Sequence, residues 1–78
     1  MTNTNKLHEG LYNEAVRCAR ESHNFRNYAE DYRIEGDYAK ADAYGVVADD
    51  LEQKARKLVQ GLTNEHKANI GLILIGSF

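Results

Sequence analysis

The 78-residue sequence contains no proline and no tryptophan, and its only cysteine is Cys18. Without proline, no residue removes a backbone hydrogen-bond donor from a helix, so long uninterrupted helices are permitted. One cysteine excludes a disulfide within the chain. A single thiol in a chain that starts with a polar segment (residues 1–5) is typical of a reducing compartment. We therefore expect a cytoplasmic protein.

Long apolar runs and a large net charge are also missing. The most apolar stretch, residues 70–75, is far shorter than the ~20 residues that a membrane-spanning helix needs. Ten Lys and Arg stand against 12 Asp and Glu, with the two signs interspersed. Nucleic-acid binding depends on concentrated positive charge, and the composition therefore disfavours both a membrane and nucleic acid as partners. The densest basic group is Lys54, Arg56, Lys57 and Lys67.

The length predicts a single helical domain over residues 1–78, because no room remains for a second core. A core of this size supplies only ~3–5 kcal/mol, so regular helix packing or association with another copy is expected to add to the stability.

Apolar and small residues recur every three or four positions from Leu7 to Tyr32, which predicts a helix over about 5–35. The pattern continues through Ser22-His23-Asn24 without a shift, although helix propensity is low there and Asn24 could cap a new helix. A continuous or mildly kinked helix fits better. The predicted inward positions are Leu7, Leu11, Ala15, Cys18, Ser22, Phe25, Ala29 and Tyr32.

Gly36-Asp37 marks the clearest boundary in the chain. Glycine adopts the left-handed conformation that ends a helix, and aspartate is a good N-cap for the next. A second helix is predicted over about 37–61, ending at Gly61, and the short connection makes the two helices an antiparallel hairpin. Its inward positions are Tyr38, Ala41, Gly45, Ala48, Leu51, Ala55, Leu58 and Leu62.

A third segment starts after Thr63 or Asn64, either of which can cap a helix. Its apolar residues are nearly consecutive, so neither the helical nor the strand period is clean. We expect a short apolar helix over about 64–75 that frays at Gly76, with strand pairing to another chain as the alternative. The predicted fold is an all-α small helical bundle.

Residues 25–48 resemble one tetratricopeptide repeat, a helix–turn–helix unit. Gly45 stands where that family has an aromatic residue in its second helix, the closing proline is missing, and nothing repeats at the required period. Because any antiparallel hairpin with a glycine turn would match similarly, the family is not assigned. The matching residues are Phe25, Tyr28, Ala29, Tyr32, Gly36, Tyr38, Ala41 and Ala48.

No catalytic, cofactor-binding or metal-binding residues are predicted. The three histidines and Cys18 lack the short spacing of a zinc site, and Cys18 falls at an inward position with no histidine placed to activate it. Nucleotide-binding and nucleophile motifs are absent as well. We therefore expect a protein that is not an enzyme.

Tyrosine is the one enriched residue type, with five copies in the first 44 positions. Tyr32 and Tyr38 fit inward positions, whereas Tyr28 and Tyr44 lie off that pattern and are expected to be more exposed. Tyr and Arg are the residues that dominate binding hot spots. The predicted partner-binding residues are Arg26, Tyr28, Arg33 and Tyr44.

The apolar C-terminal residues must be covered, either as a lid on the hairpin or as an interface between copies. These residues are Leu72, Ile73, Leu74, Ile75 and Phe78. We expect a homo-oligomeric, non-enzymatic interaction protein with a protein partner, of the inhibitor or accessory type that phages and mobile elements encode. The alternative is a homo-oligomer that binds or sequesters a small ligand, such as a nucleotide, through Tyr and Arg side chains.

Overall fold

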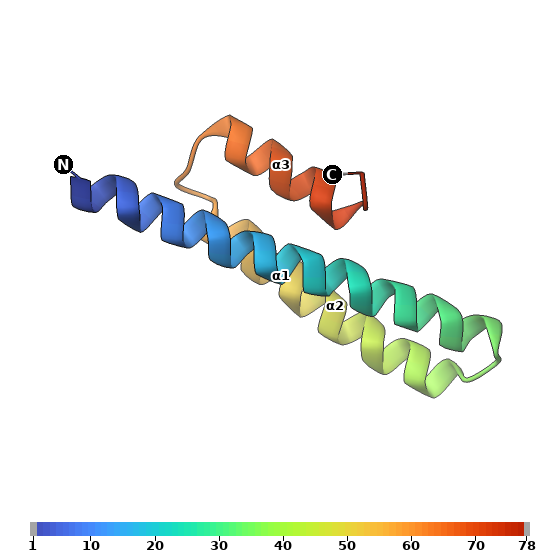
Figure 1. Ribbon diagram of the computed structural model, residues 1–78. Helices are drawn as coiled ribbons and strands as arrows, with labels where there is room; N and C mark the ends of the chain where they lie inside the picture. The colour runs from blue at the N-terminus through green and yellow to red at the C-terminus, as the bar shows by residue number, and fades with distance from the viewer. Residues whose placement is uncertain (1, 78) are drawn as a thin grey trace.

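The computed structural model describes residues 2–77, and over these it is all-helical (Figure 1). Helix α1 spans Thr2–Ile34, α2 spans Tyr38–Leu58 and α3 spans Asn64–Leu74. Helices α1 and α2 pack side by side as an antiparallel hairpin, and the short α3 lies against α1. The predicted all-α bundle is confirmed, and the apolar C-terminal segment is a helix rather than a strand.

The hairpin turn has the predicted chemistry. Gly36 adopts a φ of 87°, which only glycine enters without strain. Gly36 N–H donates to Arg33 O at 3.0 Å and Asp37 N–H donates to Tyr32 O at 2.8 Å, the two bonds of a Schellman motif. The Asp37 side chain then accepts a hydrogen bond from Lys40 N–H at 3.2 Å and caps α2. The turn therefore satisfies the backbone groups at both helix ends.

Helix α1 runs without a break through Ser22, where the sequence left a kink open. The Ser22 hydroxyl is buried and donates to Ala48 O of α2 at 2.7 Å. A serine in a helix often competes with its own backbone. Here its side chain bonds the neighbouring helix instead, so the helix continues.

Helix α2 ends earlier than the glycine signal suggested. Its C-cap is Val59, and Gly61 is not among the described residues with positive φ. Gly61 is thus a connection residue rather than the C-cap. Thr63 caps α3 by accepting a hydrogen bond from His66 N–H at 3.2 Å. At the other end of α3, Gly76 has a φ of 76°. Gly76 N–H donates to Ile73 O at 3.0 Å and Ser77 N–H donates to Leu72 O at 2.8 Å, which is a second Schellman motif. The helix therefore ends with a cap at Gly76 instead of the predicted fraying.

The core forms where all three helices meet. Alanines at the α1–α2 contact allow the backbones to approach closely, and larger apolar residues fill the space under α3. The buried cluster consists of Ala15, Cys18, Ala19, Ala55, Val59, Leu62, Ile70, Ile73 and Leu74.

Two predicted inward positions are exposed. Leu7 is 61% exposed because α1 has 33 residues against 21 in α2, so its N-terminal turns extend past the end of α2. Tyr38 is 65% exposed. Four residues before the buried Ala41, and so on the same side of the helix, is Asp37. Tyr38 follows Asp37 by one residue and is therefore rotated by about 100° away from this inward side. Both sequence predictions were therefore wrong.

Helix α3 covers only part of α1. His66 stacks on the Tyr12 ring with centroids 4.3 Å apart, and Asn69 Nδ2 donates to the Tyr12 hydroxyl at 3.3 Å. At the far end, Gly76 lies so close to His23 that a Cβ there would be 2.6 Å from the ring. α3 therefore lies along α1 from Tyr12 to His23 and leaves the hairpin tip uncovered (Figure 1).

No helix of residues 2–77 combines the length and the apolar character that crossing a membrane requires.

Candidate functional site

The four predicted partner-binding residues do not form one site. Arg26 and Tyr28 are two residues apart in α1, which places them about 200° apart around the helix. The structure accordingly groups Tyr28 with Tyr44, and Arg26 with Arg33, on different faces of the hairpin.

The tyrosines belong to a cluster that we call the aromatic face, formed by Phe25, Tyr28, Tyr32 and Tyr44. Tyr44 stacks on Tyr32 at 5.3 Å between centroids and on Phe25 at 5.7 Å, with interplanar angles of 4° and 19°. Tyr28 is tilted against Tyr44 at 6.0 Å. Lys40 lies 5.3 Å from the Tyr32 ring centroid, a cation–π distance. Four rings and one cation thus share one surface near the hairpin tip.

The exposure of the aromatic face differs from the expectation. Tyr28 is 53% exposed, as predicted, but Tyr44 is half-buried between the two rings that flank it. Phe25 and Tyr32, predicted to be inward, are half-buried too. His23 contacts the segment at the C-terminal end of α3. Tyr32 comes nine residues after His23, which is two and a half turns and places it on the opposite side of α1. The aromatic face is therefore on the side of α1 away from α3.

The arginines occupy the side of the hairpin that α3 shares. Arg26 bridges the two helices through ion pairs with Asp49 at 2.9 Å and Glu52 at 2.5 Å. Partial burial lowers the pKa of Arg26, but the hydrogen bonds that its guanidinium donates to both carboxylates outweigh this and raise it. Arg33 pairs with Glu30 at 3.3 Å. Both arginines are thus already neutralised within the chain.

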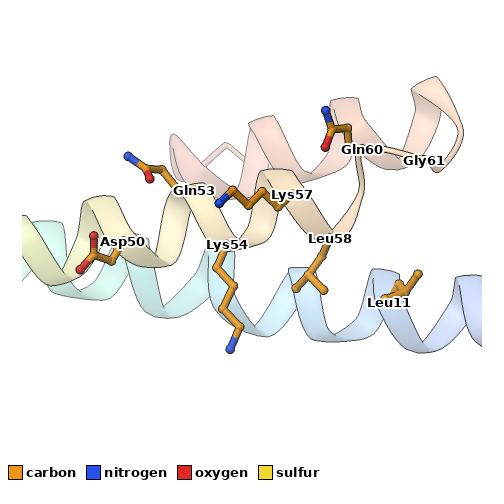
Figure 2. A pocket seen from close by; sticks show the side chains of 8 residues that line it. All are labelled: Leu11, Asp50, Gln53, Lys54, Lys57, Leu58, Gln60 and Gly61. Atoms are coloured by element: carbon orange, nitrogen blue, oxygen red, sulfur yellow. The ribbon is translucent and has the colours of Figure 1, made fainter.

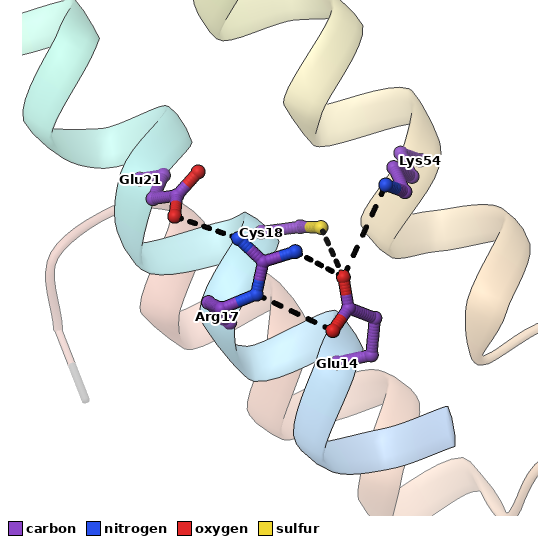
Figure 3. A network of polar contacts seen from close by, with 5 residues as sticks. All are labelled: Glu14, Arg17, Cys18, Glu21 and Lys54. Atoms are coloured by element: carbon purple, nitrogen blue, oxygen red, sulfur yellow. Dashed lines mark hydrogen bonds and ion pairs between the residues drawn. The ribbon is translucent and has the colours of Figure 1, made fainter. Parts of the chain in front are cut away.

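A second polar network lies near the middle of α1 (Figure 3). Arg17 bonds Glu14 and, at 2.8 Å, Glu21, while Lys54 of α2 approaches Glu14 at 3.9 Å. The hydrogen bond from Arg17 holds the pKa of Glu14 below its usual value. Burial raises the pKa of Cys18, whose Sγ lies 3.8 Å from a Glu14 oxygen. This environment keeps the thiol protonated and disfavours a nucleophilic role.

The hollow in Figure 2 has a volume of about 670 Å³ and lies beside the C-terminal end of α2. Leu11 and Leu58 form its apolar side, and the side chains of Gln53, Lys54 and Gln60 diverge rather than converge on a point. A ligand site normally needs a few convergent polar groups. This hollow lacks that arrangement.

The basic group predicted from the sequence gathers partly around a second hollow of about 450 Å³ between α2 and α3. Arg56, Lys57 and Lys67 line it with Val59 and Ile70. Arg56 is paired with Glu52 at 3.1 Å, and cations at the end of α2 also offset the negative end of its helix dipole. Arg56 and Lys57 thus have a structural role.

Within residues 2–77, no three His, Cys, Asp or Glu side chains come close enough together to hold a metal ion.

The predicted lid and oligomer residues divide between the two faces of α3. Ile73 and Leu74 are buried against the hairpin, at 5% exposure each. Leu72 and Ile75 point outward, at 41% and 70% exposure. Phe78 lies outside the described residues. The apolar C-terminal segment is therefore a lid on its inner face, while none of residues 2–77 covers its outer face.

Comparison of the chain with protein-family models, with curated proteins and with solved structures finds no match.

Proposed function

We propose that this chain is a non-enzymatic interaction protein that binds another protein through the aromatic face. The observation that carries the proposal is the ring cluster of Phe25, Tyr28, Tyr32 and Tyr44 on an uncovered side of the hairpin. Tyr and Phe are enriched in protein interfaces because a rigid ring buries much area at a low cost in side-chain entropy.

Two features favour a binding role over simple core filling. The rings lie at the edge of the α1–α2 contact rather than in the buried cluster, which consists of other residues. Tyr28 keeps 53% of its surface exposed while its ring packs against Phe25 and Tyr44, so its position is held without being covered. A preorganised, exposed aromatic side chain is a suitable anchor for a partner.

The alternative, a nucleotide held by tyrosine stacking and an arginine–phosphate contact, needs both residue types on one face. Arg26 and Arg33 are instead on the other side of α1 and are occupied by Glu52, Asp49 and Glu30. This separation counts in favour of a protein partner. We further propose a cytoplasmic location and an inhibitor or accessory role of the kind that phages and mobile elements encode.

The test compares three variants in capture experiments from the native host. Tyr28→Ala and Tyr44→Ala are expected to lose a partner that the wild-type chain retains. Tyr38→Ala is the matched control, because Tyr38 is a more exposed tyrosine at the same end of the hairpin but outside the ring cluster. Circular dichroism checks that all three remain folded.

Equal capture by all three variants would contradict the proposal. A rise in melting temperature with one nucleotide, abolished by Tyr28→Ala, would replace it with the ligand-binding alternative.

A further inference from the structure

The outer face of α3 is an uncharged stripe, which we define as Ala68, Gly71, Leu72 and Ile75. Their spacing of three, one and three residues places them on one side of a helix, opposite the buried Ile70, Ile73 and Leu74. Leu72 and Ile75 are among the exposed large hydrophobic residues of the chain. α3 is therefore apolar on two opposite faces, and its own hairpin covers only one.

Among residues 2–77, nothing packs close enough to Gly71 to require a glycine there. It lies inside α3, its φ is not positive, and a Cβ built there would meet nothing within 4 Å. A glycine inside a helix costs ~1 kcal/mol relative to alanine. Gly71 is half-buried beside the exposed Leu72 and Ile75. Without a side chain it permits the close approach of another backbone, and no described residue of this chain makes that approach.

The chain also contains a place for such a helix. Near the tip, a hollow of about 230 Å³ is lined by Arg26, Ala29, Glu30, Arg33 and Gly45, and we call it the tip groove. Glu30 follows His23 by seven residues, so the tip groove is on the same side of α1 as α3. Two of its lining residues, Ala29 and Gly45, are small, and alanines also occur in the part of the hairpin on which α3 already packs.

The lengths agree. α3 has 11 residues and lies along α1 from Tyr12 to His23, while the uncovered remainder of α1, residues 24–34, also has 11. Each stretch is ~16 Å long at 1.5 Å per residue. The uncovered half of the hairpin can therefore accommodate one more helix of the length of α3.

The charges also fit an apolar occupant. The outer stripe has no ionisable residue, and the charged side chains around the tip groove are paired with one another, as Arg26 with Asp49 and Glu52, and Arg33 with Glu30. A strongly charged partner segment would compete with these pairs. An uncharged helix face would partly desolvate them, but each arginine would keep its carboxylate partner, so no charge would be buried alone.

We propose that the occupant is α3 of a second copy, in a two-fold dimer. Two hairpins lie antiparallel with both α3 helices end to end between them. Each α3 places Ile70 on its own hairpin and its outer stripe, around Gly71, in the tip groove of the other copy. The contact is isologous and closed, because each chain contributes one stripe and one groove. In this dimer the contact covers the half of the hairpin nearest its tip, along the longest dimension of a molecule whose extents are 53 × 20 × 14 Å.

The test measures mass by sedimentation equilibrium on the full chain between about 1 and 100 µM, the range in which an interface of modest size assembles. Wild-type protein is expected to dimerise. Ile75→Lys puts a charge into the stripe, and Gly45→Leu fills the groove where a side chain meets nothing in the single chain. Each is expected to weaken dimerisation by about tenfold or more.

Leu7→Lys is the matched control, since Leu7 is exposed to a degree similar to Ile75 but lies outside both surfaces, and it should leave the dimer unchanged. Circular dichroism verifies the fold of each variant. A monomeric wild-type protein would overturn the proposal. So would a dimer that Ile75→Lys breaks and Gly45→Leu does not, because α3 would then pair with α3 and not with the groove. Tyr28→Ala should still dimerise, which separates this result from the proposed function.

Discussion

Ile70 is the side chain on which the docking of α3 depends most. It is fully buried and is the largest such side chain among the described residues. Truncation of a buried isoleucine to alanine removes its transfer free energy and leaves a cavity, at a cost of ~2–5 kcal/mol. The lower half of this range is expected, because α3 contacts mainly α1 and can shift to close part of the cavity. We therefore predict a loss of about 2–3.5 kcal/mol in the free energy of unfolding for Ile70→Ala.

The matched control is Ile34→Ala. Ile34 is 76% exposed, so the same chemical change should alter the free energy of unfolding by less than ~0.5 kcal/mol. Urea denaturation followed by circular dichroism measures both values. For a domain of this size, each lost kcal/mol lowers the melting temperature by ~4–8 °C, so the two variants should differ by roughly 10–25 °C. If Ile70→Ala and Ile34→Ala were equally stable, α3 would not be docked as described.

Three further predictions concern single residues. Gly36→Val should destabilise the chain by ~1–2 kcal/mol in urea denaturation, because its φ of 87° is strained for a branched residue, whereas Gly10→Ala, inside α1 with open space around its Cβ, should stabilise it or leave it unchanged. Arg17 holds the pKa of Glu14 below its usual 4.5, so ionised Glu14 stabilises the fold above that pH, and this contribution is lost as the pH falls through the lowered pKa. Glu14→Gln should therefore flatten the pH dependence of stability between about pH 5 and 3. An unchanged slope would count against the ion pair. Cys18 is fully buried with a raised pKa, so a thiol reagent should modify it at least tenfold more slowly than in urea-unfolded protein, and equal rates would mean that the core opens readily.

The hairpin could be predicted from the sequence because its signals are local. Gly36 and Asp37 determine the turn within a few residues, through a positive φ and a side-chain cap, and no distant contact is needed. The helical period then follows from alanines such as Ala41 and Ala48, which are buried as expected.

The misplaced residues depend on information that one helix does not contain. The exposure of Leu7 follows from the different lengths of α1 and α2. The half-burial of Tyr44 follows from rings on the other helix that stack on it. Similarly, the pairing of Tyr12 with Asn69 joins residues 57 positions apart, and neither residue signals it locally.

The candidate site was only partly predictable. Tyrosine and arginine enrichment pointed to the correct region of the hairpin, but the composition of a stretch does not specify the helix face. Arg26 and Tyr28 are close in sequence and still lie on different sides of α1. The role of Phe25 in the ring cluster was missed because its spacing placed it with the core, and its distance of three residues from Tyr28 was the available signal.

The contact between Tyr12 and α3 has a kinetic consequence. The hairpin closes through a three-residue connection, residues 35–37, that forms a local turn at Gly36. In contrast, α3 can dock only when the chain segment of more than 50 residues between Tyr12 and Asn69 has brought these two residues together. The entropy of closing a loop grows with its length, and non-local contacts form late. We therefore expect the hairpin to form first and α3 to pack on it last. A newly synthesised chain would then briefly be a hairpin whose apolar contact surface for α3 is exposed to solvent.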